Sequence, residues 1–428
     1  MIRNNTIVYI SYIMKNGRGE VLETTTTSYL HGSPAISKTL QSQLEGLTPG
    51  QTAKIYLKKG QENADDDFTF DITIKAIREP SPLKLHLLSG FLGSGKTTAI
   101  RQACRLLSKQ NIPVAVITND QGSRLVDGDL FTHLGIPSGQ VTNGCFCCNY
   151  NDLDAIIRYL IDRAGNGFEK SGVIFAESVG SCTDLVAAVL KPLLQQHPEW
   201  RTTMTTFADA QLLNSPTGFD ETINYIYDKQ LEEAQVIVVS KTDLLESPAG
   251  LIANMQARYP GKTILFQNSF DEEHIARWLE TLDAMAFTKD LPSLDIDYDT
   301  YGAGEAKLAW LDQQLEITSP QETAQHAAFA LIRRIAKTNH PIGHLKFLLD
   351  GHTRISITAT GTTGHPQPQP APKATLLINA RIQTEPATLS RLLATAIAET
   401  EIRSVCTIRT ITESCFQPGY PRPTHRMA

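Results

Sequence analysis

Residues 84–98 read KLHLLSGFLGSGKTT, and this stretch decides how the rest of the chain is interpreted. It opens with the apolar character of a short buried strand, and from Lys96 onward it continues with the apolar spacing of a helix. The glycines between them follow the pattern G-x-x-x-x-G-K-[ST], which lets the backbone curl until successive N–H groups point at one anion. The stretch therefore predicts a phosphate-binding loop between a strand and a helix.

The polar residues of this loop have separate expected roles. Lys96 is expected to place its charge on the β- and γ-phosphates, and the Thr97 hydroxyl is the expected ligand of Mg²⁺. The start of the helix adds its positive dipole end to the anion site. We therefore predict that the protein binds a nucleoside triphosphate with Mg²⁺. The predicted binding residues of the loop are Gly90, Gly93, Ser94, Gly95, Lys96, Thr97 and Thr98.

Length and composition limit the class of protein. A chain of 428 residues is long enough for about two to four domains. The formal net charge of -6 gives no electrostatic case for nucleic acid as the main partner. Its N-terminus opens no apolar run that resembles a signal peptide or a membrane span, so we expect a cytoplasmic protein without membrane contact. Seven cysteines, three of them at positions 145–148, indicate metal or redox chemistry rather than secreted disulfides.

Residues 1–80 are expected to form a separate β-rich unit, followed by a linker marked by Pro80 and Pro82. Strand patterns cover residues 7–13 and 68–74, and residues 36–47 predict one short amphipathic helix. The unit resembles FKBP-type peptidyl-prolyl isomerase domains in residues 19–23, 29–32, 44–50 and 70–74. By that resemblance an apolar proline pocket would be lined by Tyr12, Tyr29, Ile36 and Phe70, although these residues are equally consistent with core packing.

Two departures from the FKBP pattern change the expected role of this unit. Glu23 stands where that family usually has an aspartate, and residues 60–67 are too short for the usual flap over the active site. We therefore expect a binding or docking module first and an isomerase second.

Residues 83–288 alternate apolar strands with helical segments, which predicts a mostly parallel sheet covered on both faces. In such sheets the ligand lies beyond the carboxyl ends of the strands. The predicted strands cover residues 85–89, 113–119, 173–177, 204–208, 236–240 and 263–267.

Acidic residues follow two of these strands. Asp120 and Glu177 would face the phosphate-binding loop, where a carboxylate can hold Mg²⁺ or its water, and Gly180 would let the backbone approach the γ-phosphate. Either acid alone could instead cap a helix or face solvent. With Lys96, the two acids form the predicted catalytic group.

The end of the strand at 236–240 predicts which base is bound. Asp243 can accept two hydrogen bonds from guanine, whereas adenine offers no such pair of donors. The stem of Lys241 can lie along the face of the base, and Ser240 replaces the commoner asparagine of this signature. In a domain with a phosphate-binding loop, this pattern favours GTP over ATP.

Residues 142–150 read TNGCFCCNY and carry a dense group of thiols. Such thiols suit Zn²⁺ or another thiophilic divalent ion. Cys145 and Cys147 face one side of an extended segment, and Cys148 joins them only if the backbone turns. Three thiols would leave one tetrahedral position open, so that the metal could be released. Buried apolar cysteines or a redox pair remain alternatives, and Cys182 and Cys104 are interpreted as packing.

Together these motifs resemble the CobW-type branch of the CobW/HypB/UreG family of P-loop GTPases. The resemblance rests on GFLGSGKT at 90–97, NGCFCCN at 143–149, ESVG at 177–180 and SKTD at 240–243. It implies a GTPase that couples nucleotide state to the capture of zinc or a similar divalent ion and its delivery to a client metalloprotein. It also implies that Cys145, Cys147 and Cys148 hold the metal, and that the nucleotide site includes Lys96, Thr97, Glu177 and Asp243.

One departure from the family pattern concerns the metal. Residues 118–122 read TNDQG where the family commonly has glutamates around Asn-Glu-Phe-Gly, so an extra carboxylate ligand is not implied at this position.

Residues 289–305 are expected to link this domain to an α+β sandwich over 306–412, with a tail over 413–428. Strands are predicted at 307–317, 344–349, 354–359, 374–380 and 404–411. Helices are predicted at 389–398 and from Ser319 and Pro320 onward, the latter with the buried stripe Ala324, Ala328, Leu331 and Ile335. The predicted fold is thus an α/β P-loop GTPase between a β-rich FKBP-like domain and an α+β sandwich.

The sequence leaves three questions open. It does not decide whether the protein forms a homodimer. An ATP-dependent kinase or ligase could use the same phosphate-binding loop. The protein could also be a peptide-binding adaptor with FKBP-like isomerase activity, in which the nucleotide has only a structural role.

Overall fold

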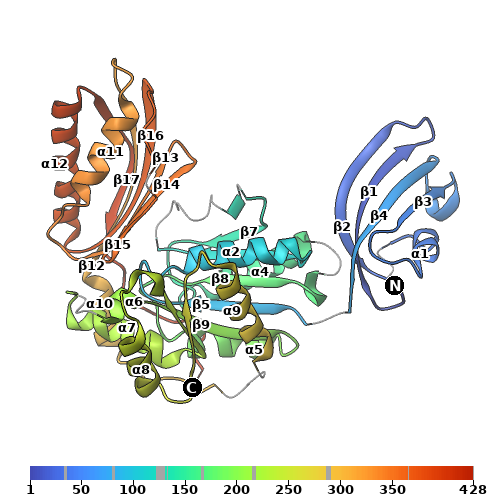
Figure 1. Cartoon of the computed structure of the whole chain (residues 1–428), viewed down its shortest axis with the longest axis horizontal. Coiled ribbons are helices and arrows are strands. Elements are labelled where there is room, and N and C mark those ends of the chain that lie inside the picture. Colours follow the sequence, from blue (N-terminus) through green and yellow to red (C-terminus); the bar gives the residue numbers. More distant parts are fainter. Residues whose placement is uncertain are drawn as a thin grey trace.

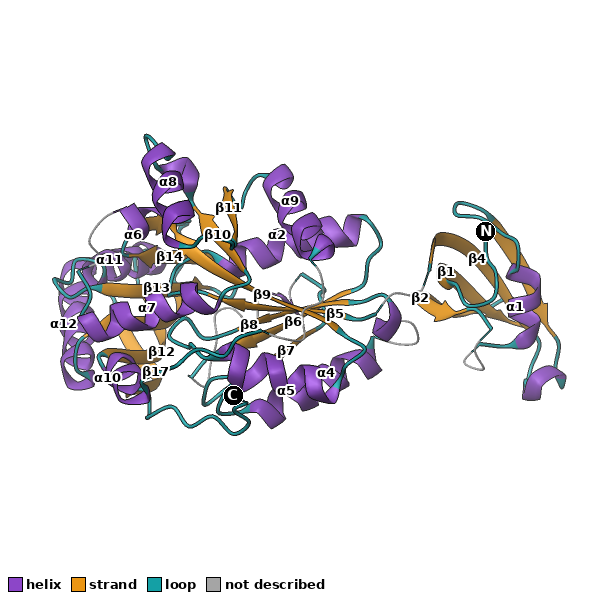
Figure 2. Cartoon of the chain, turned by 90° about the horizontal axis from the view of Figure 1, so that it is seen from below, coloured by secondary structure: helices purple, strands orange, loops and turns teal. Residues whose placement is uncertain are grey.

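The computed structural model describes residues 1–32, 36–79, 82–121, 131–132, 134–164, 168–214, 218–285, 291–364 and 366–427. The described residues form three β-sheets, of four, seven and six strands. The four-stranded and six-stranded sheets lie at opposite ends of the molecule, with the seven-stranded sheet between them (Figure 1; Figure 2). Pro80, Ser81 and Gly122 and the segment 286–290, which contains the expected domain boundary, lie outside the described residues.

The N-terminal sheet has the antiparallel order β2-β1-β4-β3 and carries one short α-helix, α1 (Lys38–Leu44). The hydroxyl of Ser37 caps this helix by accepting a hydrogen bond from the Leu40 N–H at 3.2 Å. The β-rich unit with a short helix is confirmed, but two of its strands, β2 and β3, lay outside the predicted ranges. The strands are β1 (Ile7–Asn16), β2 (Val21–Leu30), β3 (Thr52–Leu57) and β4 (Phe68–Arg78).

The four residues expected to line a proline pocket all belong to the apolar core of this unit. Tyr29 is buried, whereas Tyr12, Ile36 and Phe70 are partly buried and pack against the core. Tyr12 and Phe70 meet edge to face, with ring centroids 6.1 Å apart. This packing fits either expected role, so the FKBP resemblance stays a prediction.

The central sheet has the all-parallel order β11-β10-β9-β5-β8-β6-β7, which confirms the predicted α/β class. Every residue of β6, β8 and β10 is buried, because helices cover both faces of the sheet. Figure 2 shows α2 and α9 on one face and α4 and α5 on the other. The strands are β5 (Lys84–Ser89), β6 (Val114–Asn119), β7 (Ser138–Val141), β8 (Val173–Glu177), β9 (Arg201–Asp209), β10 (Val236–Ser240) and β11 (Thr263–Gln267).

All six strands predicted for this region are present, and β7 is an additional edge strand. The helices are α2 (Lys96–Lys109), α4 (Tyr150–Arg163), α5 (Lys191–Gln196), α6 (Ala210–Asn214), α7 (Glu221–Glu233), α8 (Ala249–Arg258) and α9 (Glu272–Ala284). Within the described ranges, no helix is long and apolar enough to cross a membrane.

The C-terminal sheet has the antiparallel order β15-β14-β13-β16-β12-β17, with α11 and α12 packed on one face (Figure 1). The predicted stripe of α11 is buried in the core between helices and sheet. The elements are α10 (Tyr298–Ala306), β12 (Leu308–Thr318), α11 (Ala324–Ile335), β13 (Ile342–Leu349), β14 (Thr353–Thr358), β15 (Gly361–Thr363), β16 (Lys373–Gln383), α12 (Pro386–Ser404) and β17 (Thr407–Phe416).

Three expectations about this part of the chain were wrong. The expected linker contains α10, which packs so closely on α7 that a side chain at Gly304 would lie 2.4 Å from the Thr222 carbonyl oxygen. Helix α11 begins at Ala324 rather than next to Ser319, because Glu322 adopts a positive φ of 55° that interrupts a helix. Strand β17 continues to Phe416, past the expected boundary at residue 412.

Candidate nucleotide and metal site

A cavity of about 450 Å³ lies at the carboxyl ends of the central strands. This is where a parallel sheet usually binds its ligand. Most residues that the sequence predicts for the nucleotide line this cavity. They are Gly93, Ser94, Gly95, Lys96, Thr97, Thr98, Asp120, Glu177, Gly180, Ser240, Lys241 and Asp243.

Gly90 does not line the cavity but shapes the loop. Its φ is 130°, and a side chain there would lie 2.2 Å from the carbonyl oxygen of Phe207. The ammonium of Lys96 donates hydrogen bonds to the carbonyl oxygens of Gly90 at 2.5 Å and Phe91 at 3.4 Å. The loop thus has the tight turn that its glycines predict, with the charge of Lys96 held inside it.

Thr97 and Glu177 come together at the start of α2 and the end of β8. The Thr97 hydroxyl donates a hydrogen bond to Glu177 Oε1 at 2.9 Å, and both side chains are buried. Hydroxyl and carboxylate oxygens at the edge of a phosphate site are the ligands that Mg²⁺ prefers. This donor set fits a Mg²⁺ ion.

Asp120 lines the same cavity but is also part of an ion pair with the C-terminal sheet. The Arg381 guanidinium, which is fully buried, donates to Asp120 at 2.9 Å and to Asp312 at 2.8 Å. The side chain of Arg381 also lies over the ring of Trp310, 4.0 Å from its centroid. Asp120 therefore connects the central sheet to the C-terminal sheet, a role that the sequence did not predict.

The residues expected to contact the base form a connected group. Ser240 Oγ donates to the carbonyl oxygen of Ser94 at 2.6 Å and so ties the end of β10 to the phosphate-binding loop. Lys241 pairs with the buried Asp209 at 2.6 Å. Asp243 lies in the short 3-10 helix Thr242–Leu244, where its exposed carboxylate faces the cavity. Asp209 was missed, although its place at the end of β9 follows the same rule that singled out Asp120 and Glu177.

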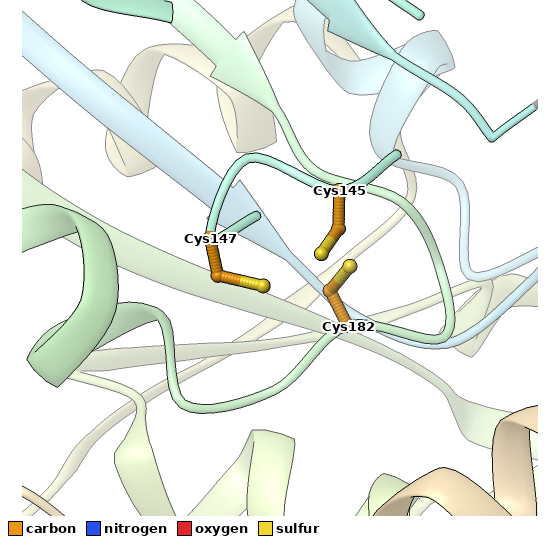
Figure 3. Close-up of side chains that lie close together, drawn as sticks. All are labelled: Cys145, Cys147 and Cys182. Atoms are coloured by element: carbon orange, nitrogen blue, oxygen red, sulfur yellow. The ribbon is translucent and has the colours of Figure 1, made fainter. Parts of the chain in front are cut away.

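Four cysteines gather beside the cavity. The sulfurs of Cys145, Cys147 and Cys182 lie within 4.8 Å of one another, and Figure 3 shows these side chains pointing toward a common centre. Cys148 joins them, with its sulfur 3.2 Å from that of Cys145. It can do so because the backbone turns, and the Cys148 N–H donates to the Cys145 carbonyl oxygen at 3.1 Å. The interpretation of Cys182 as plain packing was wrong, since its thiol belongs to this cluster.

The thiols of this cluster differ in acidity. Hydrogen bonds from the three neighbouring thiols hold the pKa of Cys145 well below its ordinary value. The pKa of Cys147 is raised because its thiol hydrogen-bonds Cys145, and burial raises that of Cys182. The hydrogen bond to Cys145 raises the pKa of Cys148 to about 11. The cluster thus offers thiols of unequal acidity, and a metal that binds them would displace their protons.

Two connections join the cysteine cluster to the cavity. Asn119, which lines the cavity, donates to the carbonyl oxygen of Gly144 at 2.7 Å and accepts from the Phe146 N–H at 2.9 Å. The chain also runs directly from Glu177 in the cavity to Cys182 in the cluster. The cavity and the cluster are therefore joined by short stretches of chain.

Residues near the C-terminus cover the cysteine loop, which the sequence did not predict. The Thr424 N–H donates to the Cys147 carbonyl oxygen at 3.0 Å, and the Arg422 N–H donates to the Cys148 sulfur at 3.3 Å. Arg426 pairs with the buried Asp184 at 2.8 Å. Residues 422–427 therefore form a strap over the cluster.

Glu305 is a further buried carboxyl group near the cluster. It accepts hydrogen bonds from Ser181 at 2.7 Å and Gln121 at 3.1 Å. Burial, and then the negative charge of Cys145, raises the pKa of Glu305 to about 8. The sequence assigned Glu305 to a linker and so could not place it here.

Comparisons with known proteins find relatives of the central part of the chain. Residues 84–265 match the family model described as CobW/HypB/UreG, nucleotide-binding domain. The zinc chaperone YjiA of Escherichia coli (strain K12) is 30% identical over 193 residues, which cover 43% of this chain and 58% of that protein. The zinc chaperone CobW of Pseudomonas aeruginosa is 25% identical over 215 residues, which cover 42% of this chain and 54% of that protein. The chain thus spans about half the length of these curated relatives.

A solved structure of HypB from Helicobacter pylori in complex with nickel aligns with a TM-score of 0.36 and 19% identity, over 47% of this chain and 85% of that one. The family match covers β5 to β10 and most of β11, and so includes the phosphate-binding loop, the cysteine loop and the end of β10. Residues 84–265 therefore match the nucleotide-binding domain of the CobW/HypB/UreG family.

Proposed function

We propose that this protein is a GTP-hydrolysing metallochaperone that binds Zn²⁺ or a similar thiophilic ion and delivers it to a client protein. The observation that carries the proposal is the direct connection between the nucleotide cavity and the cysteine cluster through Asn119 and residues 177–182. The names of the two relatives, both zinc chaperones, support a metal as the cargo.

The cavity residues suggest a division of labour in hydrolysis. Lys96 and the backbone of the phosphate-binding loop would bind the phosphates, and Thr97 with Glu177 would hold Mg²⁺. When bound, this ion neutralises charge on the phosphates. The exposed carboxylate of Asp243 lines the cavity and would accept hydrogen bonds from the two donors of guanine. Asp120, at the edge of the cavity, would orient the attacking water.

The cargo would bind at the sulfurs of Cys145, Cys147 and Cys182, with Cys148 next to them. Loss of the γ-phosphate would release Glu177 and the segment that follows it, and this would move Cys182 relative to the other sulfurs. Because linkage is reciprocal, bound metal must then also change the affinity for nucleotide.

The coupling is tested by titrating Co²⁺ or Zn²⁺ into the full chain with either a non-hydrolysable GTP analogue or GDP. Absorbance of the thiolate-to-metal bonds gives the affinity in each state. We expect the two affinities to differ by about 5- to 150-fold, the usual range for coupled sites. Equal affinities would refute the coupling.

The ligand set is tested with Cys182→Ser against Cys104→Ser. Both cysteines are buried, but Cys104 lies in α2 and outside the cluster. We expect only Cys182→Ser to weaken metal binding and to alter the absorbance. If both variants bind metal like the parent protein, Cys182 is not a ligand.

Nucleotide hydrolysis is tested with Lys96→Ala, which should abolish turnover while the circular dichroism spectrum stays unchanged. Competition with ATP separates the proposal from an ATP-dependent kinase or ligase, because ATP should fail to displace GTP. Retained turnover in Lys96→Ala would place the phosphate site elsewhere.

The N-terminal unit is proposed as a docking module for the client rather than as an isomerase. Its β-rich fold and partly exposed aromatic residues support a binding surface. A proline-isomerisation assay on a model peptide tests the alternative, and measurable catalysis would favour it.

A further inference from the structure

The nucleotide cavity has a second wall, which the C-terminal sheet supplies. Residues of β13, β14 and the following turn line it, opposite the phosphate-binding loop. The two walls touch, since a side chain at Gly93 would lie 2.5 Å from Thr358 Cγ2. They also share a hydrogen-bond network, in which Thr360 and Lys241 both bind Asp209 at 2.6 Å. A nucleotide on the loop would therefore face the C-terminal sheet.

This second wall carries basic side chains. Lys346 of β13 and Arg354 of β14 line the cavity, together with His344 and with Arg101 of α2. His344 is 5% exposed, and its Nε2 atom makes no hydrogen bond within the described structure. The same is true of the buried Nε of Arg101. Buried polar atoms without a partner are costly, so these two atoms point to a polar ligand that enters the cavity.

The charges around His344 show how closely these groups gather. Burial lowers the pKa of His344 well below its ordinary value, and the positive charges of Lys346, Arg381, Lys96 and Arg354 lower it further. Of these residues, Lys96, Lys346 and Arg354 line the cavity. A polyanion that enters the cavity would be attracted by these positive charges.

We propose that Lys346 and Arg354 form the second half of the polyphosphate site, so that the nucleotide is held between the phosphate-binding loop and the C-terminal sheet. This inference rests on the nucleotide site proposed above. A triphosphate carries more negative charge than a diphosphate, so the contribution of these two residues is larger for GTP than for GDP. The triphosphate draws the C-terminal sheet toward the loop, and hydrolysis weakens that attraction.

The test compares Lys346→Gln and Arg354→Gln with two control variants, Lys373→Gln and Arg409→Gln. The control residues lie on the same sheet, but they are 57% and 68% exposed and pair with Glu316 away from the cavity. Affinities of the full chain for a non-hydrolysable GTP analogue and for GDP are measured by fluorescence titration. We expect the cavity variants to lose about tenfold or more for the analogue, as charge-assisted hydrogen bonds usually contribute, and less for GDP. The controls should stay within about twofold.

A second readout separates ligand binding from a structural role. The rise in Tm on adding the GTP analogue should be smaller in the two cavity variants than in the parent protein and the two controls. A lower Tm without nucleotide, together with an unchanged rise, would assign these residues a structural role and overturn the proposal.

Lys96→Ala separates this inference from the proposed function. If Lys96→Ala abolishes binding and the two cavity variants bind like the parent protein, the second wall is not part of the site and the proposed function stands. If Lys96→Ala also binds normally, the nucleotide site itself lies elsewhere.

Discussion

The two antiparallel sheets at the ends of the molecule differ in how they join the central sheet. The N-terminal sheet has an apolar core made only of its own residues, from Ile2 to Ile77. Its Tyr9 hydroxyl reaches Ser171 at 2.7 Å. The C-terminal sheet instead places Leu308 and Trp310 in the core of the central unit, and its Arg381 binds Asp120.

This difference indicates which of the two antiparallel sheets can respond to a bound nucleotide. A unit with its own core and few shared contacts folds and moves independently, whereas a unit that shares core and buried charges cannot. We therefore expect changes in the cavity to reach the C-terminal sheet and to leave the N-terminal sheet unaffected. The four predictions below test this comparison, from the largest expected effect to the smallest.

Arg381→Ala should cause the largest loss of stability. It would leave the carboxylates of Asp120 and Asp312 near the interface without their cation, and breaking such a buried pair typically costs about 3–5 kcal/mol. Urea unfolding followed by tryptophan fluorescence measures the loss, since Trp200, Trp278 and Trp310 all lie outside the N-terminal unit. Arg409→Ala, on an exposed part of the same sheet, is the control. A loss below about 1 kcal/mol would mean that the two sheets are not joined through this residue.

Glu233→Gln should reduce the pH dependence of stability in the central unit. Burial raises the pKa of Glu233 from 4.5 to about 8, so the folded state keeps a proton that the unfolded state loses. Stability from this group is therefore present below about pH 4.5 and is lost as the pH rises toward 8, by on the order of a few kcal/mol. Glutamine does not titrate and keeps one carbonyl oxygen as the acceptor for the Val186 N–H, while its NH2 group replaces the oxygen that accepts from the Thr183 hydroxyl.

The free energy of unfolding of the variant and the parent protein is measured at pH 5 and pH 8 by tryptophan fluorescence, and the difference between the two pH values gives the pH dependence. Glu305 titrates in the same direction, so the variant should lose part of the slope and not all of it. No aspartate or glutamate is buried in the described part of residues 1–79, so the N-terminal unit should lack such a slope. An unchanged pH dependence of stability in Glu233→Gln would contradict the raised pKa of Glu233.

Gly93→Ala should weaken both the docking of the C-terminal sheet and nucleotide binding. The new methyl group would lie 2.5 Å from Thr358 Cγ2, in addition to the strain of a φ of 77°. Gly261→Ala, in the same central unit, is a matched control, because Gly261 has a φ of 81° but no atom within 4 Å of the added methyl. Backbone strain alone costs about 1–2 kcal/mol and should be similar in the two variants. The cost of the contact with Thr358 is therefore the difference between their losses in the free energy of unfolding, measured by urea unfolding. Equal losses would show that the C-terminal sheet can move away from the loop at little cost.

Tyr9→Phe should have the smallest effect. It removes the hydrogen bond between Tyr9 and Ser171, and one such bond contributes about 0.5–1.5 kcal/mol. Its affinities for nucleotide and metal should match those of the parent protein, as titrations of the two proteins can show. A change in either affinity would mean that the N-terminal sheet is coupled to the cavity after all.

The sequence predicted those parts of the site that are contiguous in the chain. The phosphate-binding loop and the cysteine loop are local motifs, and the buried strands of the central sheet are continuous apolar runs, so pattern alone reveals them. The pairing of Arg381 with Asp120 joins residues 261 positions apart, and Cys182 joins the cluster only because β8 ends next to the cysteine loop. Such contacts depend on the packing of whole elements, which no local pattern encodes. Helix α10 was missed because its Asp and Gly content is typical of a linker, although Asp297 caps it.

The strap of residues 422–427 has a practical consequence for work with this protein. Its backbone contacts the sulfur of the partly buried Cys148 and the carbonyl oxygen of Cys147, so alkylating or oxidising reagents should reach the buried thiols faster once residues 422–427 detach. The rate of cysteine labelling would then depend on how often residues 422–427 detach, as well as on the intrinsic reactivity of the thiols.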